Sequence, residues 1–320
     1  MIDDVLAMLE VRASEELPGW VAERLIGRTP RARTRVLSVY PARAARIKGM
    51  ASYEDYSLAE DAVRSKPTPV VDDPALLEAL RAQRVYTLVG EGEDTRLIAT
   101  FEARGEPRQV LEARGYGVGV HARDLISMAR KYYERLVESE TDPLTRLSNR
   151  RLFQAHVDAG IRRWVASGRG YYFAMLDLDR FKRINDDFGH LYGDEILVHF
   201  ANLMRATFRS ADQLYRFGGE EFVVIFGVEP PERGGEGTLE RFRKAVETYR
   251  FPGVGSVTVS IGFARVADAA TPAAILIDRA DEALYYAKEH GRNRVCAWEA
   301  LVAAGELKPK AAPQADVTLF

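Results

Sequence analysis

The chain reads RFGGEEFVVIF from Arg216 to Phe226, so that two adjacent glycines and two carboxylates lie between apolar, strand-like residues. Two glycines between strand patterns predict a two-residue hairpin turn, because both adopt positive φ at little steric cost. Gly218 and Gly219 would also let a bulky ligand approach the backbone closely. Glu220 and Glu221 begin a strand and point to opposite faces, so only one of them faces a given site squarely. Taken alone, the stretch is as compatible with exposed acids on an ordinary hairpin as with a metal or phosphate site.

A second acidic segment lies upstream, where another strand pattern ends. It reads FAMLDLDRFKRINDDFGHLYGD from Phe173 to Asp194. Ligand sites collect at strand ends, so a sheet can bring Asp177 and Glu220 together as oxygen ligands of Mg²⁺, the usual metal where carboxylates meet substrate phosphates. Lys182 supplies a point charge for a phosphate, and Asn185 with Asp194 offers the donors and acceptors that suit a purine edge. Taken singly, each side chain would be read as a solvated loop charge.

The composition predicts a soluble globular protein with two domains. The 320 residues are many for one compact core, and 47% of them are hydrophobic and 29% charged. The net charge of −2 gives no global basic field for nucleic acid or an anionic membrane, so local groups must hold any phosphate. Cys296 is the only cysteine, which excludes an internal disulfide and fits a reducing compartment. Since no apolar stretch approaches about 20 residues and the acidic start lacks signal-peptide features, we expect a cytoplasmic protein without a membrane span.

The first half, residues 1–121, predicts a small α/β domain. Strand-like runs at 34–40, 84–89 and 97–101 mix with helical patterns near 2–11, 20–26 and 74–83. The order and length of these elements resemble the small-molecule-sensing GAF domain, although no ligand motif identifies it.

A helical pattern at residues 122–141 joins the two halves. It carries an a/d seam of little more than two heptads, formed by Leu125, Ala129, Tyr132, Leu136 and Ser139. The pattern fits either a connecting signalling helix or a single amphipathic helix packed on its own domain. Asp142-Pro143 ends the helix, because the residue before a proline is pushed out of the α region.

The second half, residues 142–298, predicts an α/β sheet of mixed direction, because helices alternate with strands and a hairpin is present. We expect helices at 150–166, 194–208, 239–249 and 274–290, strands at 171–178, 257–263 and 293–298, and a hairpin at 213–228. The apolar patterning fades after Ala300, so residues 299–320 are expected to form a flexible tail.

Six motifs in this half, taken in order, resemble the GGDEF family, the diguanylate cyclases, across Asp142 to Trp298. They are the entry segment 142–150, the segments 177–182 and 185–194, the hairpin 218–222 in a Glu-Glu variant, the strand 259–262 and the turn 288–293. Six matches in the right order make the resemblance specific. It implies a ferredoxin-like core related to nucleotide cyclases and polymerase palms.

The resemblance implies an enzyme that condenses two GTP into cyclic di-GMP and releases two pyrophosphates. Asp177, the carbonyl of Leu178 and Glu220 would hold Mg²⁺, with Mn²⁺ as a substitute. Glu220 or Glu221 would accept the proton of the attacking hydroxyl, and the residues alone do not decide between them.

The same resemblance assigns residues to the nucleotide. Asn185, His190 and Asp194 would line the guanine pocket. The groups facing the triphosphate would be Lys182, Lys288, Arg292 and backbone amides near Phe181, with the Gly218-Gly219 turn against the nucleotide. Each domain would bind one GTP, so two domains must face each other in a homodimer.

A regulatory motif precedes the hairpin. Arg209-Ser210-Ala211-Asp212 ends five residues before Gly218 and resembles the family's inhibitory site, where arginine binds the cyclic di-GMP product. The alternative is a surface ion pair after a helix. We also expect residues 1–121 to receive an unknown small-molecule or protein signal that controls how two catalytic domains meet.

Two other functions stay open. One is a non-catalytic receptor that binds GTP or cyclic di-GMP and signals through protein contacts. The other is a different nucleotidyl transferase or cyclase that shares the palm-like fold. The presence of Asp177, Glu220 and Glu221 favours the enzyme, and Asp194 favours GTP over ATP.

Overall fold

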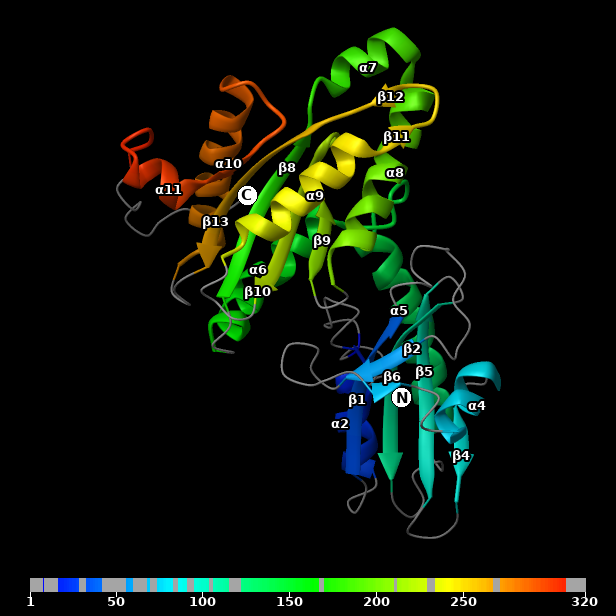
Figure 1. Cartoon of the computed structure of the whole chain (residues 1–320). Coiled ribbons are helices and arrows are strands. Elements are labelled where there is room, and N and C mark those ends of the chain that lie inside the picture. The colour runs from blue at the N-terminus through cyan, green and yellow to red at the C-terminus, as the bar shows by residue number, and fades with distance from the viewer. Residues whose placement is uncertain are drawn as a thin grey trace. The chain divides into compact units, whose positions relative to one another are not determined.

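The chain forms two compact units, Met1–Pro143 and Leu144–Phe320 (Figure 1). The computed structural model describes residues 8, 17–28, 33–41, 56–59, 68–69, 74–82, 86–90, 95–103, 106–114, 122–166, 170–209, 212–228, 234–266 and 271–308. The predicted helix at 2–11 lies outside this part of the chain except for Met8. None of the helices described is long and apolar enough to cross a membrane.

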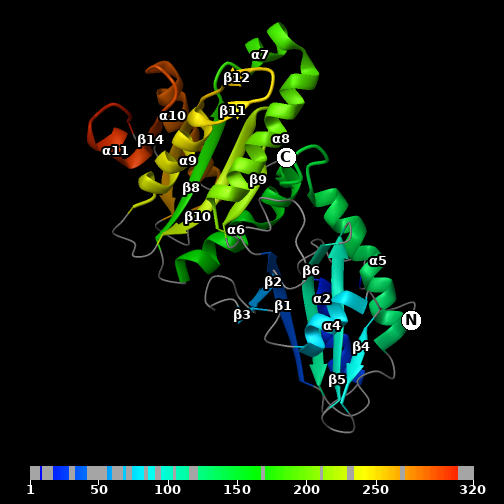
Figure 2. The same cartoon turned by 45° about the vertical axis from the view of Figure 1, so that its right-hand side comes forward.

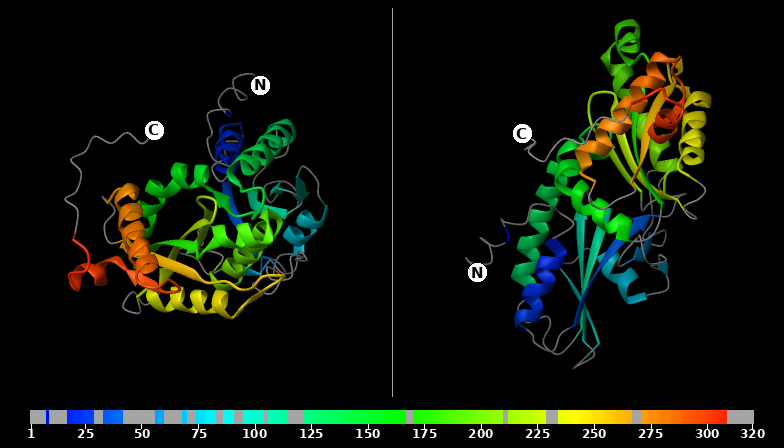
Figure 3. Two further views of the ribbon diagram at one scale, coloured as in Figure 1. Left: turned by 90° about the horizontal axis from the view of Figure 1, so that it is seen from above. Right: turned by 90° about the vertical axis from the view of Figure 1, so that its left-hand side faces the viewer.

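The N-terminal unit is built on a six-stranded antiparallel sheet in the order β3-β2-β1-β6-β5-β4. Helices α2 and α5 lie on one face of this sheet and α4 lies on the other (Figures 2 and 3). The elements are α2 (Leu17–Arg28), β1 (Arg33–Pro41), β2 (Tyr56–Ala59), β3 (Thr68–Pro69), α4 (Pro74–Ala82), β4 (Thr87–Val89), β5 (Arg96–Ala103), β6 (Glu106–Arg114) and α5 (Ala122–Glu140).

Strand β6 was not predicted from the sequence. Its residues 106–114 contain a proline and several polar side chains, so they do not form an apolar run. One of them, Glu112, is nevertheless buried, because it forms an ion pair with Arg96 of the adjacent strand β5. Ion pairing allows a charged side chain to occupy an interior strand.

Helix α5 packs on its own unit. Leu125, Ala129 and Leu136 of the expected seam are buried in the same apolar cluster as α2 and β5, and Tyr133 is buried beside them. The ring of Tyr133 meets Phe101 of β5 edge to face, with 5.4 Å between ring centroids. The seam residues therefore contribute to the N-terminal core.

The C-terminal unit contains the predicted α/β sheet of mixed direction. Its strand order is β14-β13-β8-β10-β9-β7, in which β13-β14 and β7-β9 are parallel pairs. The strands are β7 (Ser148–Asn149), β8 (Gly170–Leu178), β9 (Gln213–Arg216), β10 (Glu221–Val228), β13 (Val259–Val266) and β14 (Val295–Ala297); β11 (Arg250–Phe251) and β12 (Gly255–Ser256) form a separate small hairpin. The helices are α6 (Arg150–Ala166), α7 (Phe181–Phe188), α8 (His190–Thr207), α9 (Glu236–Thr248), α10 (Ala273–Glu289) and α11 (Trp298–Ala303).

Strand β8 is buried along its whole length because helices cover both faces of the sheet. Alternate side chains of β8, including Leu176, join a core with α8 and α9. In this core the ring centroids of Phe200 in α8 and Phe222 in β10 are 4.7 Å apart. The opposite face is covered by α6 and α10 (Figure 3). Asp177 lies on this second face, so its carboxylate points away from the main apolar core.

Helix α7, the start of α8 and the C-terminal tail differ from the prediction. Helix α7 was not expected, and α8 begins at His190 rather than near 194. The dense charges of residues 179–190 hide the short helix, and Gly189, with a φ of 91°, separates it from α8. The expected tail begins as helix α11, whose Leu301 and Val302 pack with Trp298. Residues 309–320 of that tail lie outside the described part of the chain.

Gly262 sets the distance between β13 and α10. A Cβ at this position would overlap the backbone of Ala280 and Leu284 on α10. Neither neighbour can move like the end of a flexible side chain, so only glycine allows this close packing. The contact fixes α10 over the face that carries Asp177.

We therefore predict that Gly262→Ala lowers the free energy of unfolding by about 2 kcal/mol, as overpacking does elsewhere. Gly237→Ala is the matched control, because nothing lies within 4 Å of its added methyl group in α9. Urea denaturation of both variants measures the effect. Equal midpoints for Gly262→Ala and the parent protein would show that α10 does not depend on this contact.

Candidate active site

The acidic residues of the two motifs meet at one end of the central sheet. In the strand register Asp177 lies opposite Glu221 of β10 on one side and Ser260 of β13 on the other. The backbone N–H of Leu178 donates to the carbonyl of Glu220, at 3.4 Å. Asp177 is 5% exposed, and Glu220 and Glu221 are half-buried. The end of β8 and the neighbouring hairpin thus place three carboxylates close to one another.

Lys288 brings a positive charge to this acidic end. It lies in the last turn of α10, and its Nζ is 2.7 Å from Oδ2 of Asp177. Burial raises the pKa of Asp177, and the hydrogen bond from Lys288 partly opposes that rise. Burial also raises the pKa of Glu220, with repulsion from Asp177 as the next cause. One lysine therefore does not compensate the negative charge that the site collects.

The hairpin that carries Glu220 is not the two-residue turn that its glycines predicted. Neither Gly218 nor Gly219 has a positive φ. The N–H groups of Phe217 and Gly218 both donate to the carbonyl of Glu221, so Gly218, Gly219 and Glu220 form a three-residue connection. The guanidinium of Arg216 donates to the carbonyls of Gly218 and Gly219. Arg216 therefore stabilises the turn in place of left-handed glycines, a role that the sequence pattern did not indicate.

The corner between α7 and α8 holds the residues expected to bind a base. The side-chain oxygen of Asn185 lies so close to Gly193 that a Cβ there would overlap it, and the ring of Phe181 lies beside both. Asp194 follows on α8 and is exposed. The backbone of α8 thus holds Asn185 next to Asp194, and Gly193 is a residue of this site that sequence reasoning missed.

The remaining predicted residues, as far as the structure describes the chain, form no hydrogen bond or ion pair with the carboxylates at this end of the sheet. Lys182 on α7, His190 at the start of α8 and Arg292 in the turn after α10 are all exposed. Arg292 has a φ of 62°, and its N–H donates to the carbonyl of Ala287 in α10. The turn that carries Arg292 is therefore continuous with the helix end that carries Lys288.

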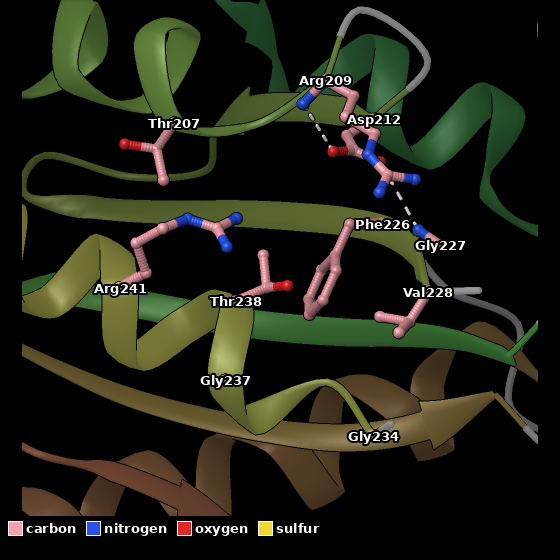
Figure 4. A pocket seen from close by; sticks show the side chains of 10 residues that line it. All are labelled: Thr207, Arg209, Asp212, Phe226, Gly227, Val228, Gly234, Gly237, Thr238 and Arg241. Atoms are coloured by element: carbon pink, nitrogen blue, oxygen red, sulfur yellow. Dashed lines mark hydrogen bonds between the residues drawn. The ribbon is translucent and has the colours of Figure 1, made fainter. Parts of the chain in front are cut away.

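The motif predicted to be an inhibitory site, Arg209 to Asp212, contributes both of these end residues to the lining of a pocket of about 420 Å³. Asp212 accepts hydrogen bonds from the N–H groups of Arg209 and Gly227, at 2.7 and 3.4 Å, so its carboxylate links Arg209 to β10. Arg241 extends into the same pocket from α9, and Phe226 lies between the two arginines (Figure 4). Two guanidinium-bearing side chains, Arg209 and Arg241, therefore line one pocket.

Comparison with known proteins identifies the C-terminal half. Residues 139–294 match the family model described as diguanylate cyclase, GGDEF domain. This half of the chain is therefore a GGDEF domain, in agreement with the resemblance read from its motifs.

The similar proteins include two curated cyclases. The chain is 42% identical over 158 residues to diguanylate cyclase DgcP of Pseudomonas aeruginosa, covering 48% of this chain and 23% of that protein. It is 35% identical over 182 residues to diguanylate cyclase DosC of Escherichia coli, covering 55% and 39%. The chain thus spans less than half the length of these relatives. Among solved structures, the GGDEF domain of DgcB from Caulobacter crescentus in complex with c-di-GMP is 35% identical, with 50% of this chain and 96% of that chain covered and a TM-score of 0.47.

The raised pKa of Glu220 predicts that its charge destabilises the folded protein. A carboxyl whose pKa is higher when folded binds its proton more tightly in the folded state, so stability falls as pH rises above the ordinary value of 4.5. Glu220→Gln should therefore melt at a higher temperature than the parent protein at neutral pH. The difference should vanish below about pH 4, where both states bind the proton.

Thermal unfolding with a chelator present, measured across this pH range, tests the prediction. Asp281→Asn removes a charge from the exposed side of α10 and controls for net charge. A Glu220→Gln protein that melts below the parent at neutral pH would contradict the electrostatic assignment.

Proposed function

We propose that this chain is a diguanylate cyclase that condenses two GTP into cyclic di-GMP with release of two pyrophosphates. The observation that carries the proposal is the acidic end of the sheet in a GGDEF domain, where Asp177 lies opposite Glu221 and beside Lys288. Carboxylates, a lysine and an exposed glycine turn suit phosphoryl transfer, which depends on positioning and charge neutralisation.

Asp177, the carbonyl of Leu178 and Glu220 would hold Mg²⁺, or Mn²⁺ in its place. These hard oxygen donors fit such an ion, and a dication would relieve the repulsion from Asp177, which is second to burial in raising the pKa of Glu220. The nucleotide and water would supply the other ligands of the ion. When bound, the metal would polarise the α-phosphate and lower the pKa of the attacking 3′-hydroxyl.

The corner between α7 and α8 would recognise guanine. Asn185 both donates and accepts hydrogen bonds while Asp194 accepts them, which matches the Watson–Crick edge of guanine, and His190 would line the same pocket. The contact of Asn185 with Gly193 supports this role because it limits the rotation of the amide. Retention of Asp194 favours GTP as the nucleotide.

The triphosphate would lie between the hairpin and the end of α10. Lys182, Lys288, Arg292 and the backbone amides near Phe181 would face it, and the Gly218-Gly219 turn would lie against the nucleotide. Lys288 would then exchange its contact with Asp177 for a phosphate oxygen. Glu220 or Glu221 would accept the proton of the hydroxyl.

Each chain would supply half of the reaction, so catalysis requires a homodimer in which two GTP-bound domains face each other. The N-terminal unit, with its six-stranded antiparallel sheet between helices, would act as a GAF-like sensory domain for a small-molecule or protein signal. Helix α5 would connect the two units along the chain. The paired arginines of the Arg209 pocket support inhibition by the product, because each guanidinium can bind a phosphate of cyclic di-GMP.

The activity is tested with purified protein, GTP and Mg²⁺. We expect cyclic di-GMP, identified by mass spectrometry, and its loss in Glu220→Gln with an unchanged circular dichroism spectrum, because that variant lacks a metal ligand. Asp281→Asn should retain activity. Nucleotide binding without product from an intact dimer would contradict the enzyme and favour a receptor.

Product inhibition is tested separately with Arg209→Ala. The variant should need at least about tenfold more cyclic di-GMP for half-inhibition, since a lost charge-assisted hydrogen bond costs about that factor in affinity. Initial rates at fixed GTP give the inhibition curves. Superimposable curves for variant and parent would make Arg209 an ordinary surface residue.

A further inference from the structure

The turn after α10 has a strained backbone. Gly291, Arg292 and Asn293 have φ angles of 111°, 62° and 45°, so two consecutive non-glycine residues occupy the left-handed region. Such residues persist only where surrounding contacts fix them, although asparagine tolerates this region better than most. The turn begins three residues after Lys288, so its contacts bear on the end of α10 that carries this lysine.

One set of contacts comes from Asp179, two residues beyond Asp177. Its carboxylate is 7% exposed and accepts three hydrogen bonds: from the hydroxyls of Thr258 and Ser260, at 2.7 and 2.6 Å, and from the backbone N–H of Asn293, at 3.0 Å. Both oxygens are thus engaged by protein donors, which distinguishes Asp179 from a metal ligand. The carboxylate ties the end of β8 to β13 and to the strained turn.

A second set comes from α9. The side-chain amide of Asn293 accepts a hydrogen bond from Arg243, at 2.7 Å, and donates one to Glu247, at 2.6 Å. Arg243 is itself buried and held by Glu240 and Glu247. Both ends of the amide are therefore satisfied by an ordered ion-pair cluster on one helix.

We propose that Asp179, Asn293 and Arg243 are positioning residues that hold the turn 291–293, and through it Lys288 and Arg292, in the geometry that binds a nucleoside triphosphate. None of these three residues would contact the nucleotide itself. That the ligand is GTP rests on the proposed function. Their effect should fall on recognition of the β- and γ-phosphates and leave recognition of the base unchanged.

Asn293→Gly is the informative variant, because glycine keeps the left-handed backbone and removes both side-chain hydrogen bonds. Lys244→Ala is the matched control, since Lys244 contacts Glu240 on the same helix and takes no part in the hydrogen bonds that hold the turn. Asp179→Ala tests the other set of contacts. Because Asp179→Ala removes a buried carboxylate, this variant can fail to fold, and Asn293→Gly then still tests the proposal.

The first measurement needs no nucleotide. Amide hydrogen exchange of residues 288–294, corrected for sequence, should be at least about tenfold faster in Asn293→Gly, while exchange in α8 and in Lys244→Ala stays at the parent value. Unchanged exchange in the turn would overturn the proposal whether or not the protein is a cyclase.

The second measurement compares ligands by calorimetry. Asn293→Gly should bind GTP with Mg²⁺ about tenfold more weakly than the parent and bind GMP equally well. An equal loss for GTP and GMP would indicate general structural damage and overturn the positioning role. If Asn293→Gly exchanges faster in the turn but the parent protein makes no cyclic di-GMP, the positioning role of these residues stands. The proposed function is then rejected instead.

Discussion

The buried carboxylate of Asp177 is the constraint on which the rest of the catalytic unit depends. A charged group at the end of an interior strand is costly unless a cation or hydrogen bonds compensate it. Lys288 supplies that compensation directly, at 2.7 Å, and Glu220 adds further negative charge beside it. The free protein therefore stores electrostatic repulsion at the position where a cation and phosphates would bind, which is a common compromise between stability and activity.

The fold keeps both partners of this contact in place from several directions. Gly262 allows α10 to approach β13 closely, which brings Lys288 over the end of β8. Asp179 and Asn293 fix the turn that follows Lys288. Helix α9 holds the same turn through Arg243 and also lines the pocket beside Arg209, so one helix contacts both the phosphate side of the site and the proposed inhibitory pocket.

The long elements of the catalytic unit could be predicted from sequence because their apolar periodicity is strong, as α6 and β8 show. Helix α7 could not, because its polar side chains mask the helical pattern. The glycine pair correctly predicted a hairpin, but the predicted two-residue turn with positive φ angles was wrong. Arg216 stabilises a three-residue connection that the dipeptide does not specify. Candidate site residues with chemistry of their own, such as Asp177, could be proposed from motifs, whereas Gly193 and Asp179 contact tertiary neighbours that no local pattern reveals.

The central claim, that Asp177 and Glu220 form the cation site of a nucleotide-binding domain, is tested most directly by Mn²⁺ binding. Electron paramagnetic resonance can follow the titration of Mn²⁺ into the protein with a non-hydrolysable GTP analogue present. We expect saturable binding in the parent protein and an affinity at least about tenfold weaker in Asp177→Asn, whose neutral amide is a poorer ligand of the same shape. Equal Mn²⁺ affinity in the two proteins would contradict the assignment of this carboxylate to the metal.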